Sequence, residues 1–234
     1  METLGFGANG WGGQLLAGTL LTIELALTTL PFGFALGLGL ALMKNARSKL
    51  LRAIGEGFTT AFRGLPELLT LLLIYYGSSI AIRTVGEWMG YSVNLELSPF
   101  IAGVIALGAV FAAYSSEVLL GALRGIDRGQ IEAGLSLGLR PFPLFLKVIF
   151  PQLLRPALPG LGNCWLALLK ETSLVSVIAL DDILRQAYLA SGQTKQPFLF
   201  YAAACTIYLL LTMLSSTVLI ALERYANRGW GHAR

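Results

Sequence analysis

The sequence is poor in charge, in cysteine and in histidine. Only 13% of its 234 residues are charged, against roughly 25% in soluble domains, which excludes an ordinary water-soluble surface. Its two cysteines, Cys164 and Cys205, lie in apolar segments, which excludes a secreted disulfide framework. The single histidine, His232, stands near the C-terminus and cannot build a metal site. No Gly-x-x-x-x-Gly-Lys-Ser/Thr motif is present, so we expect ATP to be hydrolysed elsewhere.

Apolar residues make up 55% of the chain and are gathered into long blocks. A helix needs ~20 mainly apolar residues to cross the hydrocarbon core of a bilayer. The pattern therefore predicts an all-α membrane protein with about five transmembrane helices, as a single domain over residues 1–234. The predicted spans are residues 15–43, 62–82, 99–120, 156–180 and 198–222.

Lysine and arginine are concentrated in alternate connections between these spans. The connections after the first and third spans, and the tail with Arg228, carry a basic excess, whereas acids such as Glu2 and Glu96 lie on the other side. Because cytoplasmic loops hold the basic residues, the N-terminus is predicted to be periplasmic and the C-terminus cytoplasmic. The net charge of +4 follows from this topology, and no basic stripe interleaved with aromatics points to nucleic acid.

Residues 123–152 form a cytoplasmic connection longer than packed helices usually need. Apolar residues at helical spacing precede Gly138, and Pro141 can open a second helix because proline suits a first turn. Two short helices bent at Gly138 are therefore predicted, with Phe142 and Phe145 on an apolar face of the second. Such a segment can dock on a peripheral protein and transmit its displacement, or it can lie on lipid as an amphipathic helix.

The same connection carries Glu132-Ala133-Gly134 and Gly138, followed by Val148, Phe150 and Pro151. It resembles the EAA loop of binding-protein-dependent ABC importers, with departures at Gly134, Val148 and Phe150. Further segments resemble permeases for polar amino acids, in the branch for histidine, lysine, arginine, ornithine and opines. These segments are residues 63–66, 74–77, 114–121 and 170–176.

The resemblance implies a MetI-like permease subunit of a type I ABC importer in the bacterial inner membrane, carrying polar and specifically basic amino acids or opines. It also implies a second, related permease subunit and a periplasmic substrate-binding protein. Two cytoplasmic ATPases would bind ATP and Mg²⁺, so that this chain holds no cofactor itself. They would dock at Glu132, Ala133, Gly134 and Gly138.

Two other classes compete with this interpretation. An ion-coupled secondary amino-acid transporter usually has more spans with internal symmetry, and the sequence shows neither. A membrane-embedded enzyme needs a nucleophile, metal ligands or a cofactor motif, none of which can be assembled from these residues. The chain is therefore expected to be a transporter subunit rather than a catalyst.

Four glutamates lie in or at the edges of the predicted spans: Glu24, Glu67, Glu117 and Glu171. A charged side chain at mid-membrane costs roughly 2.5–3.5 kcal/mol on insertion scales and usually faces a bundle interior or a water-filled path. The nearby cations are Arg63 and Lys170 alone, so an acidic surplus remains that could attract a cationic substrate.

Glu67, Glu171 and Glu117 are thus candidate substrate contacts, and the resemblance adds Ser173. Each acid also has a structural alternative. Glu67 can stabilise the first turn of a helix, Glu171 can pair with Arg63, and Glu117 can meet Arg124. The remaining acid, Glu24, is expected to pack between helices, as are small or polar residues that permit close approach in lipid. These residues are Gly33, Gly37, Gly39, Gly162 and Asn163.

Overall fold

The computed structural model describes residues 4–7, 10–89 and 97–227, and every regular element within them is helical. The expectations placed on Glu2, Glu96, Arg228 and His232 lie outside the described residues. The elements are α1 (Gly12–Asn45), α2 (Lys49–Gly64), α3 (Glu67–Trp88), α4 (Pro99–Arg124), α5 (Arg128–Ser136), α6 (Pro141–Leu144), the π-helical turn η2 (Phe145–Ile149), α7 (Phe150–Glu171), the 3₁₀ helix η3 (Thr172–Ile178), α8 (Ile183–Thr194) and α9 (Pro197–Ala226).

Five helical stretches of the described chain are long and apolar enough to cross a bilayer. They are α1, α3 up to Val85, α4, the stretch Pro141–Ile178 and α9. The predicted all-α membrane fold with five spans is therefore confirmed. The remaining helices, α2, α5 and α8, connect the spans.

The predicted start of the second span at residue 62 is wrong, because Phe62 belongs to α2. Leu65 is extended, with φ −90° and ψ 141°, as expected for a residue that precedes a proline. The span therefore begins at Glu67. The predicted start of the fourth span is also wrong, since Pro156 lies inside α7 instead of opening it.

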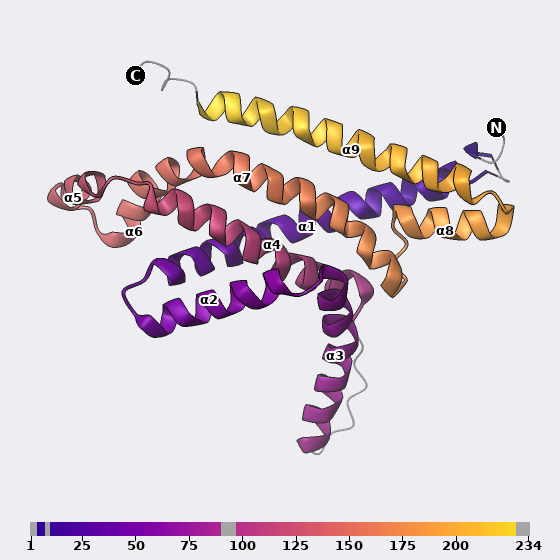
Figure 1. Ribbon diagram of the computed structural model, residues 1–234, viewed down its shortest axis with the longest axis horizontal. Coiled ribbons are helices and arrows are strands. Elements are labelled where there is room, and N and C mark those ends of the chain that lie inside the picture. The colour runs from indigo at the N-terminus through magenta and orange to yellow at the C-terminus, as the bar shows by residue number, and fades with distance from the viewer. Residues whose placement is uncertain (1–3, 8–9, 90–96, 228–234) are drawn as a thin grey trace.

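The long helices α1, α4, α7 and α9 run along the length of the molecule, and α2 lies beside α4 (Figure 1). The short helices α5 and α6 lie at one end of this bundle and α8 lies at the other, whereas α3 projects away from it (Figure 1). Helix α4 is the most buried span, with α1 and α7 as close neighbours.

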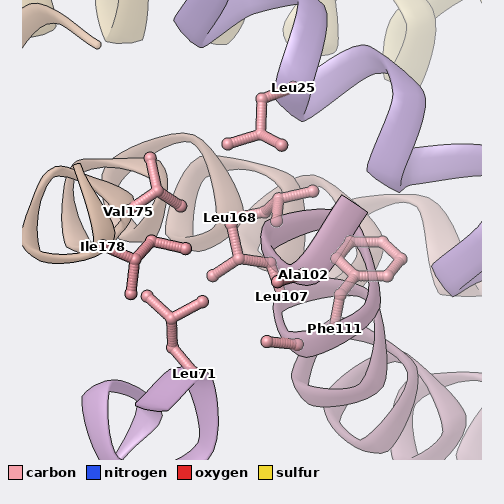
Figure 2. Close-up of a cluster of buried hydrophobic side chains, with 9 residues drawn as sticks. Leu25, Leu71, Ala102, Leu107, Phe111, Leu168, Val175 and Ile178 are labelled. Atoms are coloured by element: carbon pink, nitrogen blue, oxygen red, sulfur yellow. The ribbon is translucent and has the colours of Figure 1, made fainter. Parts of the chain in front are cut away.

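The main apolar core joins α1, α3, α4, α7 and η3 (Figure 2). Leu25 of α1 and Phe111 of α4 belong to it, and Leu71 ties the projecting α3 to Ile178 of η3. Leu71 is fully buried, and burial of a leucine side chain contributes about 1.5–3 kcal/mol. This contact fixes the N-terminal part of α3, and with it Glu67, against the end of the fourth span.

Small residues allow α1 and α4 to approach closely. A Cβ on Gly33 would lie 2.8 Å from Phe111 Cδ1, and one on Gly37 would lie 3.1 Å from the carbonyl oxygen of Ala112. The predicted packing role is thus confirmed for these two glycines, whereas Gly39 has no neighbour within 4 Å in this subunit and so serves no close packing within it. Helices in lipid associate through such close contacts.

The packing role expected of Gly162 is also confirmed, because a Cβ there would lie 3.3 Å from Leu219 of α9. Asn163 is instead exposed and lines a cavity. Glu24 is exposed on α1, so its expected packing role within this subunit is wrong. The intramembrane polar residues therefore do not all serve helix packing.

Helix α8, which the apolar pattern did not predict, is anchored by Asp182. This residue is fully buried, and its carboxylate accepts a hydrogen bond from the backbone N–H of Arg185 at 2.9 Å and one from the Tyr208 hydroxyl at 3.4 Å. Burial raises the pKa of Asp182 to about 6, although these hydrogen bonds lower it in part. The carboxylate thereby connects α8 to α9 at the end of the bundle opposite α5.

Candidate functional site

A cavity of about 340 Å³ lies between α4 and α7. Glu171, the last residue of α7, is half-buried and supplies the carboxylate of its lining. Tyr114 of α4 and Asn163 of α7 add polar groups, and the remaining lining residues are Phe111, Cys164, Ala167 and Leu168. Apolar walls with few polar groups are typical of small-molecule sites.

Glu67 and Glu171 lie close enough to interact electrostatically, and Lys170 is near Glu171. Glu67 is half-buried in the first turn of α3, where a carboxylate also stabilises the helix dipole. Two acids from different helices therefore lie within electrostatic reach of each other, one of them lining the cavity, and Lys170 lies near Glu171. A cationic group placed there would reduce the repulsion between them.

Ser173, the fourth candidate contact, is half-buried in η3. Its hydroxyl donates a hydrogen bond to the carbonyl oxygen of Lys170 at 2.8 Å, and the residue is not part of the cavity lining. Its contact with substrate stays a prediction. In this structure the hydroxyl serves the local turn that follows Glu171.

Glu117 stands at the centre of an ion-pair network. Its Oε1 atom lies 3.0 Å from Lys44 Nζ of α1 and 3.2 Å from Arg63 Nη1 of α2. Lys44 Nζ also donates to Ser116 Oγ at 3.0 Å. The partner expected for Glu117, Arg124, is therefore replaced by two residues from other helices, and Arg63 pairs with Glu117 rather than with Glu171.

Lys44 is the residue of this network that sequence reasoning missed. Its side chain is 2% exposed, and Gly55 of α2 covers it, since a Cβ at position 55 would lie 2.8 Å from Lys44 Cγ. In the sequence Lys44 is one of several basic residues after the first span, and nothing there separates a buried lysine from solvated ones.

A second cavity, of about 930 Å³, continues along the same pair of helices. Glu117 and Arg155 line it, together with Asp127 and Gln130 near α5. Tyr114 of the first cavity and Glu117 of the second lie one turn apart on α4. The groove between α4 and α7 therefore leads from the intramembrane acids toward the α5–α6 end.

The segment between α4 and α7 has the predicted bend, but the prediction of a second short helix is wrong, because α6 continues without a break through η2 into α7. Gly138 has φ +76°, a backbone conformation that glycine adopts without penalty, and it separates α5 from α6. Gly134 is buried, and a Cβ there would clash with Leu144 of α6. Glycine in place of the second alanine of the EAA pattern thus lets the two short helices pack closely.

The outer surface of this segment is free to receive a partner. Glu132 and Ala133 are exposed on α5, and Leu137 and Phe142 are 82% and 71% exposed. The turn at the start of α5 is capped by Asp127, whose carboxylate accepts from Gly129 N–H at 2.7 Å. Glu132 lies within the helix and does not cap it, so its carboxylate remains available.

Known proteins are similar to this chain over nearly its whole length. Residues 33–228 match the family model of the binding-protein-dependent transport system inner membrane component. The octopine transport system permease protein OccQ of Rhizobium meliloti is 41% identical over 229 residues, covering 98% of this chain and 97% of that protein. The histidine/lysine/arginine/ornithine transport system permease protein HisQ of Escherichia coli (strain K12) is 40% identical over 220 residues, covering 94% and 96%.

Solved structures agree with this similarity. A chain from the crystal structure of an amino acid ABC transporter with histidines superposes with a TM-score of 0.76 at 32% identity, covering 92% of this chain and 95% of that one. A chain of the inward-facing MetNI methionine ABC transporter gives a TM-score of 0.72 at 19% identity, covering 92% and 96%. The second likeness concerns the fold alone.

Proposed function

Because this chain belongs to the family of binding-protein-dependent transport system inner membrane components, and is thus a multi-pass permease subunit of an ATP-driven importer, we propose that it carries basic amino acids or opines. ATP hydrolysis in these importers belongs to separate subunits, and a substrate-binding protein delivers the cargo. The ion-coupled transporter considered from the sequence has no support among these relatives.

The proposal is carried by the pair of acids beside the smaller cavity. Glu171 lines that cavity, and Glu67 lies within electrostatic reach of it. A lysine, arginine or guanidinium-bearing opine would bring one positive charge to these two carboxylates, in addition to that of Lys170 near Glu171. A neutral side chain would leave the repulsion between the acids uncompensated. Relatives named for octopine and for histidine, lysine, arginine and ornithine handle cargo of this chemistry.

The proposed assembly contains a related second permease subunit and two ATPases, with the N-terminus periplasmic and the C-terminus cytoplasmic. Support comes from the helix ends, because α8 and the start of α1 lie at one end of the bundle and the α5–α6 segment lies at the other (Figure 1). An ATPase that binds the exposed surface of Glu132, Ala133 and Gly138 would displace α4 and α7, to which α5 and α6 are joined. Rigid displacement of this kind opens and closes the groove between those helices.

Uptake by the reconstituted importer tests the substrate proposal. Glu171→Gln should lower the rate of arginine uptake roughly tenfold, because a hydrogen bond to a charged group contributes about 1.5–3 kcal/mol. Uptake of citrulline, which has nearly the shape of arginine without its charge, should not fall. Glu87→Gln is the matched control, since that acid pairs with Arg83 on the surface of α3 at 3.7 Å.

Glu67→Gln should produce the same selective loss with a smaller amplitude, because Glu67 does not line the cavity. Arginine uptake at the wild-type rate in both variants would refute recognition of the cationic group. An equal loss of arginine and citrulline uptake would assign the two acids to structure instead.

A further inference from the structure

We infer that Arg63 is a second specificity-determining residue, one that binds the carboxylate of the transported amino acid. The inference rests on the proposed function and extends it to recognition of the substrate carboxylate. Glu171 and Glu67 would hold the cationic end of the substrate, and the Arg63 guanidinium would hold its α-carboxylate. A substrate with both groups would therefore lie along the groove between α4 and α7 in one orientation.

Charge is the first reason. Lys44 and Arg63 both bind the same oxygen of Glu117, at 3.0 and 3.2 Å. Two cations on one carboxylate leave the network with one excess positive charge. The Lys44 side chain is 2% exposed and already has Ser116 as a second partner, whereas the Arg63 side chain is 45% exposed. An anion can therefore approach Arg63 and not Lys44.

Position is the second reason. Arg63 lies over the ring of Tyr114, with its Cζ atom 5.6 Å from the ring centroid, and it contacts Glu117 through Nη1. Tyr114 lines the intramembrane cavity and Glu117 lines the larger one. The guanidinium of Arg63 lines neither cavity, but it reaches from α2 to contact one lining residue of each, and it therefore lies beside the place where the two cavities adjoin on α4.

The third reason is the geometry of the guanidinium group. Arginine presents five N–H donors in a planar fork that matches a carboxylate, and it stacks on aromatic rings. One donor is engaged by Glu117, and the ring of Tyr114 supports one face of the plane. The remaining donors suit a substrate carboxylate better than a lysine ammonium would, because a fork can bind both oxygens together.

Equilibrium binding to the complete permease–ATPase complex in detergent, without the binding protein, tests this assignment. Radiolabelled arginine is displaced by unlabelled arginine or by agmatine, which is arginine without its carboxylate. The wild-type complex should bind arginine roughly tenfold or more tightly than agmatine, which is the selectivity expected from one hydrogen bond to a charged group. Arg63→Gln should abolish that preference by weakening arginine alone, and Arg63→Lys should retain part of it.

Arg83→Gln is the matched control, because Arg83 is an exposed arginine paired with a glutamate on α3, and it should leave the preference unchanged. Arg63→Gln protein that still prefers arginine, or that loses arginine and agmatine equally, would overturn the inference alone. Wild-type complex that binds neither cation would overturn the basic-substrate proposal together with it. Glu171→Gln should weaken both ligands, which separates the cationic contact from the anionic one.

Discussion

Removal of the Glu117 carboxylate should destabilise the subunit through the lysine that it leaves behind. In Glu117→Gln the ammonium of Lys44 stays buried with Ser116 as its remaining partner. Breaking a buried ion pair from one side costs about 3–5 kcal/mol. Because the Glu117 side chain is 39% exposed, we expect the low end of that range, roughly 3 kcal/mol.

Lys44→Met should behave differently, although it breaks the same contact. The charge that it removes is the desolvated one, and the Glu117 carboxylate keeps Arg63 and solvent. Replacement of a buried charge by an apolar side chain of similar volume is often nearly neutral. The double variant Lys44→Met/Glu117→Gln should therefore be as stable as Lys44→Met alone, so that Lys44→Met rescues the stability lost in Glu117→Gln.

Thermal unfolding of the purified complex in detergent measures this difference. One kcal/mol corresponds to about 2–4 °C for a chain of this length, so Glu117→Gln should lower Tm by roughly 6–12 °C, and the double variant should restore most of the loss. Equal Tm values for Glu117→Gln and the double variant would refute the reasoning, because the cost would then not come from an unpaired Lys44.

Three further outcomes follow from the packing and the caps. Gly37→Ala should lower Tm by several degrees, because overpacking costs about 1–3 kcal/mol where α1 meets the backbone of α4, whereas Gly39→Ala, in open space, should not. Gly138→Val should reduce substrate-stimulated ATP hydrolysis severalfold, since φ +76° strains a β-branched residue, and Gly57→Ala on α2 serves as the control. The stability of the wild type relative to Asp182→Asn should fall as pH rises from about 4 to 6 and then level off. The reason is that burial raises the pKa of Asp182 to about 6, so that ionisation of this carboxyl group destabilises the folded state. The full loss of stability is on the order of 3 kcal/mol. Asp181→Asn, at an exposed neighbour, should show no such trend.

The five spans could be predicted because each is a long apolar run. The bend at Gly138 could be predicted because Gly138 and Pro141 interrupt the helical pattern. The helix α2 could not be predicted in this way. Its residues are mostly exposed, and its C-terminal apolar residues continue into α3 across Gly64-Leu65-Pro66. Apolar content alone joins the two helices, whereas the backbone restriction imposed by Pro66 separates them.

The sequence could identify which acids belong to the candidate site, but it could not identify the basic residues with which they pair. Glu67, Glu117 and Glu171 stand out as acids in apolar segments, because such charges are costly in a membrane. Their partners lie far away in sequence, and Glu117 and Arg63 are 54 positions apart. Which acid meets which base depends on how α1, α2 and α4 pack, and neither periodicity nor composition contains that information.

We propose that the α5–α6 segment transmits the work of ATP hydrolysis to the groove between α4 and α7. The most direct measurement is simultaneous uptake and ATP hydrolysis in proteoliposomes whose permease has residues 129–137 replaced by a Gly/Ser linker of equal length. The altered subunit should insert together with its permease partner but support no ATP-driven uptake. Uptake at the wild-type rate in these vesicles would contradict a coupling role for the α5–α6 segment.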